Sequence, residues 1–151
     1  MYMEVKSSVK PVDYMDSMDF LEKRVEAVIQ GKEDELLWVL EHKSVFTAGT
    51  SYNDKDLIDK KIKLIKTNRG GKITHHAPGQ KVVYFVLNLN KRKKDIKLLV
   101  NKIENCIIEI LKYYKITSYK DKKNIGIWID SRQGSKKIAA IGIRVKKWIA
   151  Y

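Results

Sequence analysis

The sequence has a single cysteine, no long apolar run and few arginines, and each shortage excludes a class of protein. With Cys106 alone, the chain cannot carry an internal disulfide framework, and this suits a reducing cytoplasm. No apolar run approaches the roughly 20 residues that span a bilayer, so a membrane protein is excluded. Acidic side chains at Glu4, Asp13, Asp16 and Asp19 interrupt any N-terminal apolar stretch, so no cleavable signal is expected.

The positive charge of the chain comes almost entirely from lysine. The formal net charge is +13, yet arginine occurs at only five positions, which are Arg24, Arg69, Arg92, Arg132 and Arg144. Two explanations stay open: the bias reflects only genomic base composition, or the surface meets acidic partner proteins, for which complementary charge raises encounter rates. The densest basic run, residues 91–94, is either a docking surface or a solvated loop.

Periodicity in the apolar residues predicts a single α+β domain over residues 1–151. Linkers, repeats and low-complexity segments are absent from the sequence. Apolar positions at helical spacing predict two long helices, and apolar runs between turn residues predict strands. The helices are expected at 15–30 and 95–114, and the strands at 36–40, 45–47, 82–89, 126–129 and 137–145, the last two joined as a hairpin.

Cys106 is predicted to lie in the core. It follows Ile103 by three residues and precedes Ile110 by four, which places it on the expected apolar face of the second helix. A thiol buried among aliphatic side chains stays protonated and unreactive. Cys106 is therefore not expected to act as a nucleophile.

The segment RGGKITHHAPGQ, residues 69–80, is the strongest candidate for a binding site. Adjacent glycines let backbone amides approach a ligand, Arg69 offers a planar fork of donors, and His75 and His76 can donate, accept or titrate near neutral pH. The alternative is a polar hairpin loop in which the glycines only satisfy turn geometry.

Three motifs in order resemble the octanoyltransferase family, also called lipoyl(octanoyl) transferases. They are Glu41, His42 and residues 45–49, then residues 69–80, then KKIAAIGIRV at residues 136–145. The chain departs from the family pattern with His75 in place of a common Tyr and Ala77 in place of a common Gly. The resemblance implies octanoyl transfer from octanoyl-acyl carrier protein to a lysine of a lipoyl domain, in lipoate biosynthesis.

Fold, partners and location are also implied by this resemblance. The fold is expected to be of the biotin/lipoate protein ligase type, a mixed sheet with helices packed on it. The implied partners are octanoyl-acyl carrier protein, the lipoyl domains of 2-oxoacid dehydrogenases and the glycine cleavage H protein, in the cytoplasm. No cofactor, metal, nucleic acid or membrane is implied.

The resemblance also assigns the site residues. Lys137 matches the lysine that lowers the pKa of a nucleophilic cysteine, and that cysteine is absent after Lys137. The chain is therefore expected to be a catalytic domain incomplete at its C-terminus, and inactive alone. His76 matches the histidine beside the reacting carbonyl, and His42 is either a second polar support or a strand-end histidine. The expected acyl-binding residues are Arg69, Gly70, Gly71, Lys72, Ile73, Thr74, His75, His76, Ala140, Ile141 and Gly142.

Two other functions are weighed against octanoyl transfer. An ATP-dependent lipoate or biotin ligase would share the fold, but the segment 69–76 lacks a further glycine that lipoate ligases tend to show, and no phosphate-loop motif occurs. A basic nucleic-acid-binding module would gather aromatic residues and arginines on one face, whereas Trp38, Trp128 and Trp148 are scattered among apolar strands.

Overall fold

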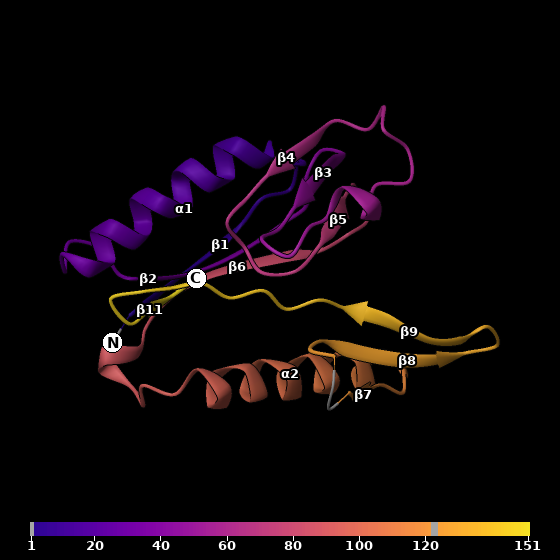
Figure 1. The fold of residues 1–151 in the computed structure, drawn as a ribbon. Helices are drawn as coiled ribbons and strands as arrows, with labels where there is room; N and C mark the ends of the chain where they lie inside the picture. The colour runs from indigo at the N-terminus through magenta and orange to yellow at the C-terminus, as the bar shows by residue number, and fades with distance from the viewer. Residues whose placement is uncertain (1, 122–123) are drawn as a thin grey trace. The chain divides into compact units, whose positions relative to one another are not determined.

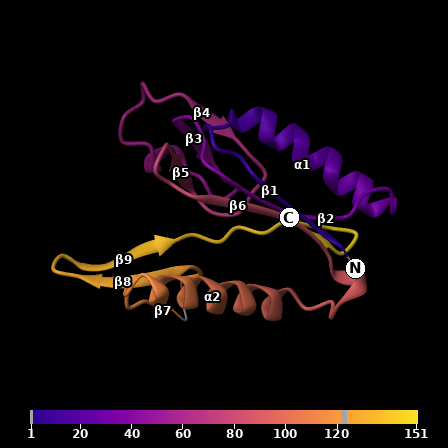
Figure 2. The same ribbon diagram turned by 180° about the vertical axis from the view of Figure 1, so that it is seen from behind.

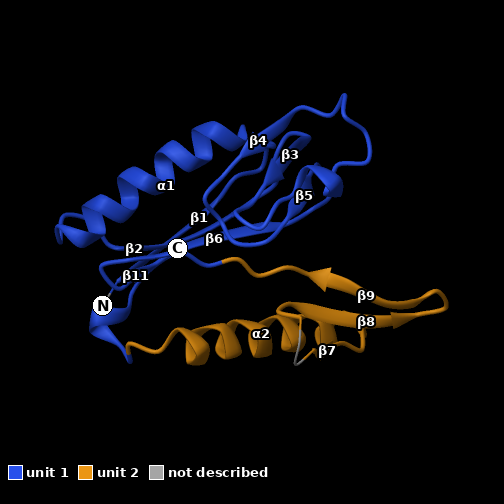
Figure 3. Ribbon diagram, in the orientation of Figure 1, with its two compact units in different colours: residues 1–93, 143–151 blue, residues 94–142 orange. Residues whose placement is uncertain are grey.

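A computed structural model of the protein describes residues 2–121 and 124–151. The chain forms two compact units, each described here by itself. Unit 1 comprises residues 1–93 and 143–151, and unit 2 comprises residues 94–142 (Figure 3). Both contain helix and strand, so the α+β class is confirmed. The prediction of a single catalytic domain over residues 1–151 stays a prediction.

Unit 1 is built on a five-stranded mixed sheet with the strand order β1-β2-β6-β11-β10. β1 runs parallel to β2, and the other neighbouring pairs are antiparallel. In the β2–β6 register, Leu36 lies opposite Val86 and Trp38 opposite Tyr84. The strands are β1 (Met3–Ser7), β2 (Glu35–Leu40), β6 (Val82–Asn88), β10 (Val145–Lys146) and β11 (Ile149–Ala150).

Helix α1 (Tyr14–Ile29) runs along one face of this sheet (Figures 1 and 2). It begins where the Asp13 carboxylate accepts a hydrogen bond from the Met15 amide at 2.9 Å. It ends before Gly31, whose φ of 70° is the left-handed conformation that glycine adopts without strain. The buried residues recur at helical spacing: Tyr14, Ser17, Leu21, Arg24, Val25 and Val28.

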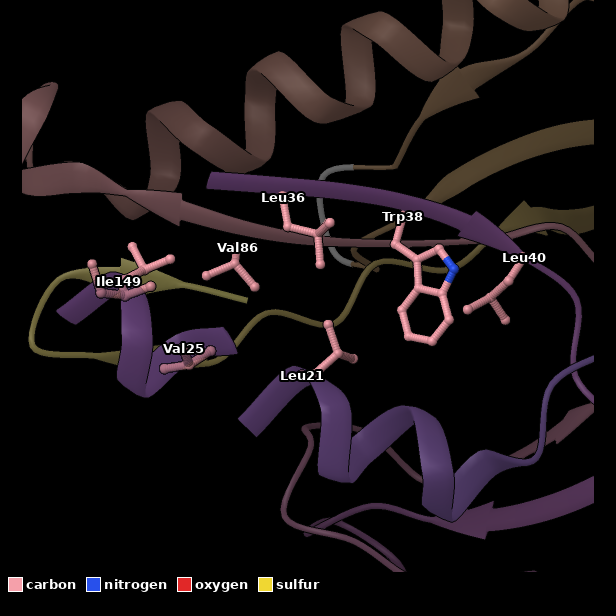
Figure 4. Packing of buried hydrophobic residues seen from close by; sticks show 8 residues of the cluster. Leu21, Val25, Leu36, Trp38, Leu40, Val86 and Ile149 are labelled. Carbon is pink, nitrogen blue, oxygen red and sulfur yellow. The ribbon is translucent and has the colours of Figure 1, made fainter. Parts of the chain in front are cut away.

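The hydrophobic core of unit 1 lies between α1 and the sheet (Figure 4). Leu21 and Val25 of the helix meet Leu36, Trp38 and Val86 of the central strands. Leu36 and Val86 are fully buried, which explains why β2 and β6 were both predicted from sequence as strong apolar runs. The sheet therefore provides a rigid base for the loops at its ends.

A second, three-stranded sheet in unit 1 carries the segment 69–80. Its order is β4-β3-β5, with β3 parallel to β4 and antiparallel to β5. The bounds are β3 (Val45–Ala48), β4 (Leu64–Lys66) and β5 (Ile73–His76). A short 3₁₀ turn, η1 (Asp54–Asp56), lies in the loop between β3 and β4.

Residues 91–94 of the basic run are exposed, and Arg92 also pairs with a buried carboxylate. Its guanidinium bonds both oxygens of Glu35, with Nη2 donating to Oε2 at 2.6 Å. The Asn88 amide donates to Glu35 Oε1 at 2.7 Å. These contacts attach the 3₁₀ turn η2 (Leu89–Lys91) and the residue after it to β2.

Unit 2 holds helix α2 (Ile96–Tyr113) and a three-stranded antiparallel sheet, β7-β8-β9. The Asp95 carboxylate caps α2, because it accepts a hydrogen bond from the Leu98 amide at 2.9 Å. The strands are β7 (Tyr119–Lys120), β8 (Ile127–Ser131) and β9 (Gly134–Ala139), and the predicted hairpin of β8 and β9 is confirmed. Among the described residues, no helix is both long and apolar enough to cross a membrane.

The prediction that Cys106 is a core residue is wrong, because its side chain is exposed. The buried position on α2 is Glu104, which pairs with Lys120 at 3.7 Å. At 3.6 residues per turn, Cys106 lies about 160° around the helix from Glu104. Ile110, on the same side as Cys106, is 53% exposed. The apolar arc of α2 is wide, and sequence spacing alone placed its buried centre on the wrong side.

The predicted strand 137–145 is only partly correct. β9 ends at Ala139, where its pairing with β8 ends, and residues 140–144 have no strand structure. Ala140, Ile141 and Gly142 therefore form a connecting segment, and the alternation expected across them does not apply.

Candidate functional site

The guanidinium of Arg69 bonds to the protein's own chain. Nη2 donates to Thr47 O at 3.0 Å, to Thr47 Oγ1 at 2.7 Å and to Lys72 O at 3.0 Å, and Nη1 donates to Gly70 O at 2.9 Å. The guanidinium, which was expected from the sequence to bind a ligand, thus joins the loop 69–72 to β3. Arg69 fixes the shape of the glycine loop.

The loop 69–72 is also bound by the backbone that follows β3. The Gly49 amide donates to Lys72 O at 3.0 Å, and the Thr50 amide donates to Arg69 O at 2.8 Å. A Cβ at Gly49 would meet Gly71 O at 2.4 Å and Gly70 O at 2.8 Å. Gly49 is therefore required by close approach of backbone to backbone, a role its place in the sequence did not reveal.

Gly70 and Gly71 differ in what they allow. Gly71 has a φ of 87°, so a side chain there would strain the backbone. Nothing lies within 4 Å of the position that a Cβ on Gly70 would occupy. The loop therefore presents bare backbone at Gly70 to open space.

Lys72 is held by an ion pair, and Ile73 and Thr74 are held by pairing with β3. Lys72 Nζ lies 2.7 Å from a carboxylate oxygen of Asp56 in η1. Ile73 and Thr74 pair with Ala48 and Thr47 across the β3–β5 ladder. Residues 72–74 of the expected binding segment are therefore fixed to η1 and to β3.

The adjacent histidines point in opposite directions, as neighbours on a strand do. His75 is exposed, stacks on Phe46 with ring centroids 4.1 Å apart, and its Nε2 lies 2.9 Å from Ser44 Oγ. His76 is half-buried and stacks on Tyr14, with a centroid separation of 6.1 Å. The structure therefore brings only His76, of the two, to the interior.

His76 joins a histidine–tyrosine cluster, defined as Tyr14, His42, His76 and Tyr84. His42, two residues after β2, is fully buried at the centre of the cluster. Its ring meets Tyr14, His76 and Tyr84 edge-on, with centroids 5.4, 5.6 and 5.7 Å away. His42 follows the end of β2 and both of its ring nitrogens have partners, so both predicted roles of His42 stay predictions.

The hydrogen bonds of His42 determine its protonation. Nδ1 lies 3.0 Å from Val12 O, and since a carbonyl only accepts, Nδ1 carries the proton. Nε2 therefore accepts from the Tyr84 hydroxyl at 2.9 Å. Burial lowers the pKa of His42 from its ordinary 6.5, against opposing effects of Val12 and Asp13, so the ring is neutral.

The other members of the cluster are also shifted by burial. Burial lowers the pKa of His76, and the Gln80 side chain, 2.6 Å from His76 Nδ1, opposes this. Burial raises the pKa values of the Tyr14 and Tyr84 hydroxyls. At neutral pH the cluster is uncharged and its phenols can donate hydrogen bonds.

Tyr84→Phe is expected to lower the free energy of unfolding by about 1–2 kcal/mol, because it leaves His42 Nε2 buried without a donor. Chemical denaturation measures this, and Tyr113→Phe, which removes a hydroxyl from a tyrosine that is 83% exposed, is the control. Equal effects of the two changes would contradict the assignment.

The free energy of unfolding is also expected to decrease as the pH is lowered, because of His42. Its folded pKa lies below 6.5, so the unfolded chain takes up the proton first as the pH drops below 6.5. The contribution is therefore fully present above 6.5 and declines below it. A His42→Gln variant should show a weaker pH dependence between pH 5 and about 7 in the same denaturation series.

Lys137 and residues 140–142 belong to unit 2. Lys137 lies on β9 opposite Trp128, and its Nζ donates to Ile125 O at 2.7 Å. Lys136, on the other face of the strand, donates to Gln133 Oε1 at 2.7 Å. Gly142 has nothing within 4 Å of the position of an added Cβ, so bare backbone is again presented.

Tyr14, Thr47 and Tyr84 are site residues that sequence reasoning missed. Tyr84 had a detectable signal, because it alternates with Val82 and Val86 and must share their face of β6. Thr47 lies within the motif at residues 45–49, but no local pattern indicated its bond to Arg69; Tyr14 gave no signal, since its contact with His76 comes from a distant part of the chain. Within residues 2–121 and 124–151, no three His, Cys, Asp or Glu side chains group as metal ligands.

Comparison of the sequence with known proteins identifies its family. The profile described as "Lipoyl protein ligase A/B catalytic domain" matches residues 13–151. The octanoyltransferase of Wolbachia pipientis is 43% identical over 140 residues, covering 92% of this chain and 68% of that protein. The octanoyltransferase of Anaplasma phagocytophilum is 44% identical over 142 residues, covering 93% and 68%.

The fold comparison agrees. The chain is similar in fold to a structure from an archaeal lipoylation system, a bipartite lipoate protein ligase and its E2 lipoyl domain from Thermoplasma acidophilum, with a TM-score of 0.66 at 15% identity. The match covers 99% of this chain and 59% of that one. The expected lipoate-ligase type of fold is thereby confirmed. On the strength of the sequence match, the chain belongs to the octanoyltransferase family within the lipoyl protein ligase A/B catalytic domains.

Proposed function

We propose that this chain takes part in transferring an octanoyl group from octanoyl-acyl carrier protein to a lysine of a lipoyl domain, as an acyltransferase of cytoplasmic lipoate biosynthesis. The observation that carries the proposal is the identity of 40–44% to octanoyltransferases over almost the whole chain. The fold is shared with a lipoate protein ligase, so the fold does not choose the reaction.

In unit 1, the acyl-binding surface is proposed to be the loop and strand from Arg69 to His76. Arg69 and the backbone after β3 hold the loop in one shape, so binding costs little ordering. Gly70 leaves its backbone open to a methylene chain. Burial of each methylene contributes about 0.8 kcal/mol, which is enough for eight carbons to bind by apolar contact.

His76 is proposed to act beside the reacting carbonyl as a neutral imidazole. Its Nδ1 faces the Gln80 oxygen at 2.6 Å, which places the proton on Nδ1. Nε2 then retains its lone pair and can accept a hydrogen bond. Exposed His75, at a position where the family commonly has Tyr, is proposed to contact the carrier or client rather than the acyl tail.

In unit 2, Lys137 is proposed to supply the positive charge for the acyl-transfer step, and Ala140, Ile141 and Gly142 to line the acyl chain. A cysteine thiolate would attack the octanoyl thioester, forming a new thioester while the phosphopantetheine thiolate leaves. The client amine would then attack that thioester carbon, releasing the cysteine thiolate and losing its proton to a base. Lys137 would stabilise the thiolate by its charge.

The 151 residues contain one cysteine, Cys106, which lies on the exposed side of α2, so the polypeptide is proposed not to complete turnover. The test incubates it with octanoyl-acyl carrier protein and a lipoyl domain, with octanoylation measured by mass spectrometry. No multiple turnover is expected, and Cys106→Ser should behave identically. Repeated turnover that is lost in Cys106→Ser would overturn the assignment of the nucleophile.

Binding is tested separately from turnover. Backbone amide resonances of 69–76 and 140–142 are expected to shift when octanoyl-pantetheine is added, and hexadecanoyl-pantetheine should shift them less. Shifts confined to other residues would contradict the proposed surfaces. Incubation with ATP and octanoate distinguishes a ligase, because pyrophosphate release would show adenylation instead of transfer from a carrier.

The proposed partners are octanoyl-acyl carrier protein and the lipoyl domains of 2-oxoacid dehydrogenases and the glycine cleavage H protein. Acidic carriers would meet a chain of net charge +13, and complementary charge raises the association rate. Binding of octanoyl-acyl carrier protein should therefore weaken as salt rises. A labelled oligonucleotide that bound equally well at physiological salt would favour nucleic acid as the partner instead.

A further inference from the structure

We propose that Gly126 and Trp128 are positioning residues for Lys137, forming a lysine cradle with the Ile125 carbonyl. The inference rests on the role proposed for Lys137, but the contacts that carry it lie entirely within unit 2. Neither Gly126 nor Trp128 belongs to the segments discussed for acyl binding.

Two groups of the cradle contact the ammonium directly. Lys137 Nζ donates to Ile125 O at 2.7 Å and lies 5.0 Å from the centroid of the Trp128 ring. A carbonyl oxygen and an aromatic face are both electron-rich, so both attract a cation. The ammonium is thus held at one point instead of sweeping through solvent on a flexible stem.

Trp128 is itself fixed. Its Nε1 donates to Asn124 O at 3.1 Å, one residue before the carbonyl that accepts from Lys137. Trp128 and Lys137 are direct partners in the β8–β9 register. Cross-strand partners place their side chains on the same face, so the ring and the lysine stem meet without rearrangement.

Gly126 makes room for the lysine stem. A Cβ there would lie 3.1 Å from Lys137 Cδ, 3.2 Å from Lys137 Cε and 2.6 Å from Ala139 O. Its φ of 123° is also one that side-chain-bearing residues rarely adopt. The absence of a side chain at Gly126 lets the Lys137 side chain pass close to the backbone and reach Ile125 O.

Lys136 provides an internal control in the same strand. It lies one residue earlier, opposite Ile129, and its ammonium bonds only a side-chain oxygen of Gln133 in the exposed turn. The two lysines therefore differ in their local contacts, but they are adjacent on the same strand and can be measured in the same peptide by mass spectrometry. A change in overall stability affects the acetylation rates of both lysines, so it cancels in the ratio of the two rates.

The experiment uses the 151-residue chain and measures acetylation of both lysines by acetic anhydride, without acyl carrier or client. In the unmodified protein, Lys137 is expected to react more slowly than Lys136, because its ammonium is held. Trp128→Leu should raise the Lys137/Lys136 ratio about two- to fivefold. Trp128→Phe, which keeps an aromatic face, should restore most of the protection.

Gly126→Ala should raise the same ratio by displacing the lysine stem, with circular dichroism reporting whether the hairpin still folds. If it does not fold, the Trp128→Leu and Trp128→Phe pair decides. An unchanged ratio in Trp128→Leu, or equal ratios in the two Trp128 variants, would overturn the cradle. Because no octanoyl compound is present, this failure is distinct from failure of the proposed octanoyl transfer.

Discussion

Arg92→Ala is expected to lower the free energy of unfolding by about 3 kcal/mol, because it leaves a buried carboxylate without its cation. The Glu35 side chain is 2% exposed, and Arg92 bonds both of its oxygens. The Arg92 side chain is 32% exposed, so water can partly replace it, which places the expected loss at the lower end for a broken buried pair. Urea denaturation followed by circular dichroism measures the change.

The same variant is expected to change how stability depends on pH. Burial by itself would raise the pKa of Glu35, but the hydrogen bonds from Arg92 and the Asn88 amide outweigh it and lower the pKa below 4.5. The stabilisation is therefore present above pH 4.5 and is lost as the pH falls below that value. Without Arg92, burial raises the pKa, so the gap between variant and parent should narrow in acid.

Arg132→Ala is the matched control for Arg92→Ala. Arg132 is exposed in the turn between β8 and β9, so its removal changes the net charge equally but uncovers no buried group. Its effect should stay within about 0.5 kcal/mol. If both arginine variants lose the same stability, the Glu35–Arg92 pair has no special role.

Gly49→Ala is expected to destabilise the β4-β3-β5 sheet by about 3 kcal/mol and to weaken binding of octanoyl-pantetheine at least tenfold. The new methyl group would overlap Gly71 O at 2.4 Å and Gly70 O at 2.8 Å, and these are backbone atoms that cannot rotate away. The loop 69–72 must then move from the position that Arg69 imposes. Denaturation and the chemical-shift titration together measure the two effects.

Gly70→Ala is the matched control for Gly49→Ala. Both variants replace a glycine by alanine, but only the new methyl group at position 49 would clash with backbone atoms. An added Cβ at Gly70 meets nothing within 4 Å, so the change in stability should stay below about 1 kcal/mol. Its octanoyl-pantetheine affinity should still fall, since the open backbone at Gly70 is proposed to face the acyl chain. A Gly49→Ala protein as stable as Gly70→Ala would contradict the close packing at Gly49.

Local patterns predicted the secondary structure well where one face of an element is clearly apolar. The helices at 14–29 and 96–113 and the strands at 35–40 and 82–88 agree with their expected bounds to within one or two residues. The errors arose where the pattern was broad or continuous. The apolar arc of α2 does not reveal its buried centre, and the alternation past Ala139 does not reveal where the partner strand ends.

The sequence by itself determined the α+β class, the order of the motifs and the membership in the octanoyltransferase family, because these depend on residue types at fixed spacing along the chain. Only the tertiary structure decided that Arg69 bonds Thr47, that His42 is buried against Tyr84, that Arg92 neutralises Glu35 and that Lys137 rests on Trp128. Each of those contacts joins residues at least nine positions apart. Their partners are selected by sheet register and packing, which no local pattern specifies.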